Sequence, residues 1–255
     1  MVRVLIPIVA ALLLTACGAE APRAPVAPKN EPATEAGYVV PPMVTRVQTT
    51  PAGLMLTGSA RAGASIRLAS PEGGSLASVA DNNGVWRMTM APAPAARLFG
   101  LSTTQGKRTV QAQGYLLLTP AGTAYQLRAG AGAIRIGPVA APKITAFDFD
   151  REGAAIVSGV APAGTAITVR ADGRQSADGR STAAGRFTIS LTQPLPPGAH
   201  TIKIYNDGAE NSATIATSPA ASLVDGPFRS SSTAAGLRVD WMTPGGGVQS
   251  TVITN

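Results

Sequence analysis

Few side chains in this sequence combine the types and the spacing that catalysis or metal binding requires. Asp148 and Asp150 alternate in Phe147-Asp148-Phe149-Asp150, so a β-strand there would place both carboxylates on one side. Two carboxylates supplemented by loop carbonyls could hold Ca²⁺, which prefers about six to eight oxygen ligands. The alternative is a solvated acidic face that points away from Phe147 and Phe149. The pair is therefore a candidate calcium site, and the sequence indicates no other metal site.

The other reactive side chains do not form a catalytic set. His200 is the only histidine, and without a second His or a paired Cys we expect it to be exposed or partly packed on a strand rather than to bind zinc. No G-x-S-x-G motif is present, and Ser230–Ser232 are expected in a polar loop. Gly130–Gly132 lacks the full dinucleotide-binding fingerprint. We therefore expect a protein that is not an enzyme and needs no cofactor.

The only cysteine, Cys17, follows a short apolar segment. After Met1-Val2-Arg3, residues 4–14 are apolar, and Thr15-Ala16 precede the cysteine. A transmembrane helix needs about 20 apolar residues, so this run fits a secretion signal instead. Leu14-Thr15-Ala16-Cys17 resembles the lipobox of bacterial lipoproteins.

That resemblance implies cleavage between Ala16 and Cys17, and attachment of diacylglycerol and a fatty acid such as palmitate to Cys17. The protein would then be held to a membrane of the bacterial cell envelope by its lipid. Gly18 stands where an Asp retains lipoproteins in the inner membrane of enteric bacteria, which implies the outer membrane, at its periplasmic face or at the cell surface. The alternative is an ordinary signal peptide in which Cys17 is incidental.

Composition favours short strands over long helices. The 255 residues include 28 Gly and 21 Pro, while only 4% are aromatic and 14% charged. The net charge of +7 comes mostly from arginines that are scattered singly. Such a protein could meet acidic envelope components, but without a basic run we expect no nucleic-acid partner. Residues 18–40 are dominated by Ala, Pro and Glu, which predicts a disordered linker.

An internal repeat organises the rest of the chain. Residues 41–91 align with residues 142–192 without a gap, at an offset of 101, and Trp86 then matches Phe187. A period near 100 residues fits a whole small domain. Apolar and polar residues alternate in Ser65–Ala69, which predicts a half-buried strand. The two copies diverge in sequence after Met90.

The second copy carries a family resemblance. Residues 157–169 read VSGVAPAGTAITV, residues 185–191 read GRFTISL and residues 195–202 read LPPGAHTI. These strings resemble bacterial Ig-like domains, which implies β-sandwiches. We expect a signal peptide at 1–16, the lipidated Cys and linker at 17–40, sandwiches at 41–140 and 141–218, and a connection with a C-terminal β-hairpin at 219–255.

Two segments share the pattern of an apolar strand, Thr-Pro-x-Gly and a second strand. They are Tyr115–Arg128 and Val239–Val252, and both are predicted to be β-hairpins. The C-terminal hairpin could complete the second sandwich or pair with the first one. Residues 207–235, rich in Ala, Ser and Thr, are expected to include a flexible connection.

The sequence thus predicts an all-β protein with two tandem Ig-like sandwiches. The leading hypothesis is a non-enzymatic, membrane-anchored envelope lipoprotein that acts as a structural or interaction module, with an unidentified envelope protein or polysaccharide as partner. The alternative is an accessory lipoprotein that captures a glycan or another anionic molecule. Trp241 and Tyr125 are the candidate contacts for such a ligand, although both rings could instead pack across their hairpins.

Overall fold

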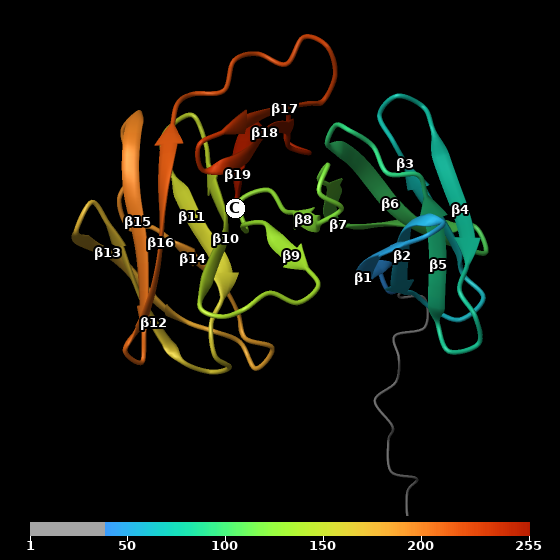
Figure 1. Ribbon diagram of the computed structural model, residues 1–255. Helices are drawn as coiled ribbons and strands as arrows, with labels where there is room; N and C mark the ends of the chain where they lie inside the picture. The colour runs from blue at the N-terminus through green and yellow to red at the C-terminus, as the bar shows by residue number, and fades with distance from the viewer. Residues whose placement is uncertain (1–38) are drawn as a thin grey trace, which may run out of the picture. The chain divides into compact units, whose positions relative to one another are not determined.

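Two sandwiches with the same strand arrangement make up the described part of the chain. The computed structural model describes residues 39–255 (Figure 1). Cys17, Ala16, the signal peptide and most of the linker lie outside the described residues. All strand pairs within residues 39–255 are antiparallel, and this range contains no helix that could cross a lipid bilayer. The predicted all-β class is confirmed.

The first sandwich pairs a three-stranded sheet, β1-β2-β5, with a six-stranded sheet, β4-β3-β6-β7-β8-β9. Its strands are β1 (Met43–Thr50), β2 (Gly53–Ser59), β3 (Ser65–Ala69), β4 (Ser75–Val79), β5 (Val85–Met90), β6 (Arg97–Gln105), β7 (Arg108–Leu118), β8 (Ala124–Leu127) and β9 (Ile134–Ile136). The first seven strands form the Ig-like sandwich, in which the fourth strand pairs with the third. Strands β8 and β9 extend the larger sheet beyond it.

The second sandwich repeats this strand order, but its added strands extend the sheet that corresponds to β1-β2-β5. Its strands are β10 (Lys143–Phe149), β11 (Ala155–Val160), β12 (Ala166–Ala171), β13 (Arg174–Arg180), β14 (Arg186–Ser190), β15 (Gly198–Asn206), β16 (Ala209–Thr217), β17 (Phe228–Thr233), β18 (Gly236–Met242) and β19 (Val248–Thr254). One sheet is β13-β12-β15-β16, and the other is β14-β11-β10 continued by β19-β18-β17.

The structural repeat is longer than the sequence repeat. Strand β6 begins at residue 97 and its counterpart β15 at residue 198. Strand β7 begins at residue 108 and its counterpart β16 at residue 209. The offset of 101 therefore persists after Met90, where the sequences diverge. Strand positions survive this divergence because a strand needs only inward residues that fill the core, and different residue types can do so.

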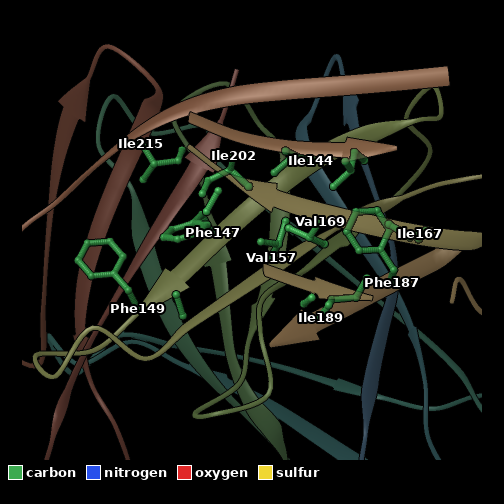
Figure 2. Close-up of a cluster of buried hydrophobic side chains, with 14 of the residues drawn as sticks. Ile144, Phe147, Phe149, Val157, Ile167, Val169, Phe187, Ile189, Ile202 and Ile215 are labelled. Atoms are coloured by element: carbon green, nitrogen blue, oxygen red, sulfur yellow. The ribbon is translucent and has the colours of Figure 1, made fainter. Parts of the chain in front are cut away.

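Each sandwich has its own core, and a matched glycine shapes both. Trp86 lies opposite Gly58 on paired strands of the first sandwich, and Phe187 lies opposite Gly159 in the second. A Cβ at Gly58 would lie 2.1 Å from a ring carbon of Trp86, and one at Gly159 would lie 2.7 Å from Phe187. A side chain at either glycine would therefore displace the aromatic ring. Figure 2 shows the second core, in which Phe187 lies among β-branched side chains.

A third core joins the two sandwiches through the added strands. It lies between the outer faces of the two six-stranded sheets (Figure 1) and consists of Ala96, Leu98, Leu117, Tyr125, Leu127, Ala133, Ala146, Val239, Trp241 and Ile253. Leu117 is buried in this core, which we call the joint core, while Leu116 and Leu118 are buried in the first core. The C-terminal end of β7 is therefore covered on both faces. Residues 39–255 accordingly form one compact unit.

The C-terminal hairpin pairs with the second sandwich and not with the first, although its side chains pack against the first. Strand β19 pairs with β10 and so extends the second sandwich, while Trp241 and Ile253 pack against the first sandwich in the joint core.

The expected connection is shorter than predicted. Strands β16 and β17 occupy much of residues 207–235, which leaves residues 218–227 without a strand. Ser230–Ser232 belong to β17 rather than to a loop. Strand β17 is an exposed edge strand, and its inward alternation is therefore too weak to be recognised in the sequence.

Candidate functional site

The Asp148 carboxylate lies buried between the two sandwiches. Its Oδ2 accepts a hydrogen bond from the backbone N–H of Ala133 at 2.8 Å, and its Oδ1 accepts from Gln249 Nε2 at 3.0 Å and Thr251 Oγ1 at 2.6 Å. Only 1% of the residue is exposed. The side chain points away from Phe147 and Phe149, as expected, but the face it occupies is buried rather than solvated.

These hydrogen bonds continue on both sides of Asp148. Thr251 Oγ1 accepts from Trp241 Nε1 at 3.0 Å, and Gln249 Oε1 accepts from the backbone N–H of Gly130 at 3.1 Å. The segment between β8 and β9 is thereby fixed to β10 and β19. Burial raises the pKa of Asp148, against the opposing effect of its three donors and of the nearby Arg128 charge. We call this set of hydrogen bonds the joint network; it joins Asp148, Trp241, Gln249 and Thr251 to the backbone of Gly130 and Ala133.

Asp150 has a separate role. Its Oδ1 accepts a hydrogen bond from the backbone N–H of Ala154 at 2.9 Å and so closes the turn between β10 and β11. No group of three His, Cys, Asp or Glu side chains within residues 39–255 is placed to hold a metal ion. Calcium binding by Asp148 and Asp150 stays a prediction of the sequence, and the structure gives both carboxylates protein partners.

The two candidate aromatic contacts both lie in the joint core. Trp241 is fully buried and meets Tyr115 edge-on, with 5.8 Å between ring centroids. Tyr125 is 3% exposed, and burial raises its pKa, although hydrogen bonds to Arg135 and Thr123 act in the opposite direction. Both rings therefore pack across their hairpins and do not offer an exposed stacking surface.

His200 is buried, where the sequence predicted exposure or partial packing. It occupies the inward position on β15 that Phe99 has on β6. Its Nδ1 lies 2.7 Å from Asp172 Oδ2, and its Nε2 lies 2.8 Å from the carbonyl oxygen of Pro196. An ionised carboxylate and a carbonyl both accept only, so both hydrogen bonds form together only when the ring is an imidazolium that donates from both nitrogens. The ring thereby holds the turn before β15 against the turn between β12 and β13.

This arrangement makes part of the stability depend on pH. Burial lowers the pKa of His200, but its hydrogen bonds to Asp172 and Pro196 outweigh that effect and raise the pKa above 6.5. The hydrogen bond from His200 lowers the pKa of Asp172 below 3.8. The histidine contribution is full below about pH 6.5 and is lost as the pH rises through the raised pKa. The aspartate contribution is full above about pH 3.8 and is lost as the pH falls through the lowered pKa.

We expect His200→Gln to lower the free energy of unfolding by about 1 kcal/mol at pH 5.5 and by less at pH 8.5, because the histidine contribution is lost as the pH rises. The effect is modest because Asp172 is half exposed and its charge is screened. Urea unfolding at the two pH values measures this difference. Asp172→Asn is the matched control and should remove the same dependence. An equal loss at both pH values in His200→Gln would contradict the imidazolium assignment.

A second buried carboxylate was not recognised in the sequence. Asp240 accepts hydrogen bonds from Arg229 at 2.7 Å, Arg238 at 2.8 Å and Ser250 at 2.7 Å. Burial raises the pKa of Asp240, but these bonds and the Arg238 charge outweigh it, and the pKa lies below its ordinary value. The guanidinium of Arg238 also lies over the ring of Phe149, 5.2 Å from its centroid. This cluster ties the C-terminal strands to β10.

Two pairs of arginines, about 50 residues apart in the sequence, line one open cleft. The cleft has a volume of about 500 Å³ and is bordered by β9, β11 and β14. We call it the arginine cleft, and its charged side chains are Arg128, Arg135, Arg180 and Arg186. No sequence pattern predicts this cleft, because the two pairs belong to different sandwiches and meet only in the folded protein.

No family model matches the chain, and no curated protein is significantly similar. Among solved structures, one described as "Biofilm associated protein - BSP domain" matches with 15% identity and a TM-score of 0.25, over 72% of this chain and 30% of that chain. The chain thus spans under a third of that protein's length. A similarity this weak carries no argument about function.

Proposed function

We propose that this protein is a non-enzymatic, lipid-anchored module of the bacterial envelope that presents a rigid pair of sandwiches to a protein partner. The observation that carries the proposal is the joint core with its joint network. Domains in one chain move relative to one another unless their interface is large and apolar. Here the interface has ten buried apolar residues, including Trp241, and a buried polar network. Such a pair transmits position and force without bending at the joint.

The proposed anchor rests on the sequence. Lipidation of Cys17 would fix one end of the chain, since two or more acyl chains hold a protein stably on a membrane. The Ala- and Pro-rich linker of residues 18–40 could then reach roughly 70 Å at about 3.1 Å per residue in an extended conformation. The sandwiches would be held away from the lipid surface.

Strand β4 is the edge best suited to receive a partner. Its residues Ser75–Val79 include no charge and no proline, and Val79 is 63% exposed. The equivalent edge strand β13 carries Arg174, Asp178 and Arg180, and its pairing with β12 has a register shift. Charges and irregularities protect sheet edges from added strands. An unprotected edge such as β4 can recruit an extended segment of another protein by strand addition.

The test is in-cell photo-crosslinking of the full chain. We expect a photoreactive residue at Val79 to give discrete adducts in the membrane fraction. The same residue at Gln111, which is exposed on β7 within the same sheet, is the matched control and should give none. Cys17→Ala should abolish fatty-acid labelling and move the protein to the soluble fraction.

Two results would overturn the proposed anchor or the proposed contact edge. One is wild-type protein that carries no fatty acid and stays soluble, which would remove the anchor. The other is an identical set of adducts from Val79 and Gln111, which would remove the edge as the contact. Catalytic turnover by the purified protein that survives loss of His200 and Asp148 would contradict the non-enzymatic assignment.

A further inference from the structure

The arginine cleft concentrates positive charge in one place. Arg128 and Arg135 are partly exposed on its β9 side, and Arg180 and Arg186 are exposed on the side of the second sandwich. The hydroxyl-bearing residues Thr145, Thr182 and Thr188 also line it. No acidic side chain is among the described residues that line the cleft.

The four guanidinium groups have little to bind within the protein. None of them forms an ion pair in residues 39–255. Arg128 donates to the carbonyl oxygens of Gly132 and Ala131, and Arg180 donates to that of Gly164. Arg135 donates to the carbonyl oxygen of Pro138 and bonds with Tyr125. Each guanidinium has five N–H donors, so most donors in the cleft remain available to a ligand.

Asp148 is the one carboxylate near the cleft within residues 39–255 that acts on these arginines, and it acts on Arg128 alone. It acts through its charge, but its carboxylate oxygens are already occupied by Ala133, Gln249 and Thr251. Like charges held together repel one another, and an anion that binds among them relieves that repulsion. The cleft is therefore suited to an anionic ligand.

We propose that the arginine cleft is a binding site for a ligand that carries clustered phosphate groups. A guanidinium pairs well with either a carboxylate or a phosphate. A carboxylate has two coplanar oxygens, which one or two arginines satisfy. A phosphate group presents its oxygens tetrahedrally, so arginines that approach from two walls can each engage a different oxygen. Four arginines on opposing walls fit two or more phosphate groups better than a single carboxylate.

The size of the cleft agrees with a small ligand or one segment of a polymer. Ligand sites commonly have volumes of about 300–1,000 Å³, and this cleft has about 500 Å³. A neighbouring cleft of about 460 Å³ shares Arg135 and Thr145 and adds Lys143. A longer phosphorylated ligand could continue from one into the other. This inference is independent of strand addition at β4, which lies on a different edge.

The test is calorimetric titration of the full-length protein, purified in non-ionic detergent, with inorganic tripolyphosphate, with citrate and with monomeric dihexanoyl phosphatidic acid. We expect saturable binding of a phosphate compound that is tighter than citrate binding and weakens with added salt. Arg180→Gln combined with Arg186→Gln should weaken that binding by at least about ten-fold, because charge-assisted hydrogen bonds are lost.

The matched control combines Arg67→Gln with Arg87→Gln, which removes the same charge from exposed strand positions outside the cleft. This pair should leave the affinity within about two-fold, because exposed charges at a distance are screened. Preference for tripolyphosphate would support a ligand with clustered phosphate groups, and preference for the phosphatidic acid, which carries a single phosphate, would contradict it. Absence of saturable binding, equal affinity for citrate or equal loss in the two double variants would overturn the proposal.

Discussion

Asp148→Ala is expected to lower the free energy of unfolding by about 2–4 kcal/mol. The substitution leaves the Ala133 N–H, the Gln249 amide and the Thr251 hydroxyl without their shared acceptor in a buried site. Each buried donor without a partner costs about 1–3 kcal/mol, and release of the buried carboxylate offsets part of that cost. Urea unfolding of the variant and of the wild type measures the difference.

The loss should depend on pH with a defined sign. Because the pKa of Asp148 is raised in the folded protein, the wild type loses stability as the pH rises from about 4 through that raised value. The cost of Asp148→Ala is therefore expected to be larger at pH 4.5 than at pH 7.5.

Asp148→Asn keeps one acceptor oxygen but turns an amide N–H toward the Ala133 N–H, and it should cost less than alanine. Asp178→Ala, on an exposed strand, is the control. A cost no larger than that of Asp178→Ala would refute the role of the joint network.

Trp241→Ala is expected to cost about 3–5 kcal/mol and to uncouple the unfolding of the two sandwiches. The indole is fully buried in the joint core, and large aromatic-to-alanine changes in cores have this magnitude. Its loss also removes the donor to Thr251 and the edge contact with Tyr115. Each sandwich keeps its own core, so each should then unfold separately.

The sequence offers a direct readout of this uncoupling. The chain has two tryptophans, so in Trp241→Ala the fluorescence of Trp86 reports the first sandwich alone. We expect the fluorescence and far-UV circular dichroism midpoints to coincide in the wild type and to separate in the variant. Trp241→Phe keeps an aromatic ring in the core and should keep the midpoints together. Coincident midpoints in Trp241→Ala would show that the joint core does not couple the sandwiches.

Local pattern was sufficient to predict much of the fold. Alternation in Ser65–Ala69 identified a strand because one face of the sheet is buried and the other is exposed. The Thr-Pro-x-Gly turns identified the β7–β8 and β18–β19 hairpins because the turn geometry needs those residue types. Strand β17 was missed because an edge strand with exposed serines has no inward pattern.

The candidate site could not be predicted in the same way. Asp148 is bonded by Gln249 and Thr251, which are 101 and 103 residues away, and no local pattern encodes such a partnership. Its carboxylate therefore looked like half of a calcium site. Arg135 and Arg186 each looked like a lone surface charge, and only the packing of β9 beside the second sandwich brings them to one cleft.

The unequal additions to the two copies have a consequence for how this sequence can change over evolutionary time. Repeats that fold separately can accumulate substitutions independently. Here Leu117 of one copy packs in the same core as Trp241 beside the other, and Gln249 binds the Gly130 backbone across the joint. A substitution on either face of the joint alters the fitness of substitutions on the opposite face. The two halves are therefore expected to co-vary as a single hereditary unit, although each retains the outline of an independent domain.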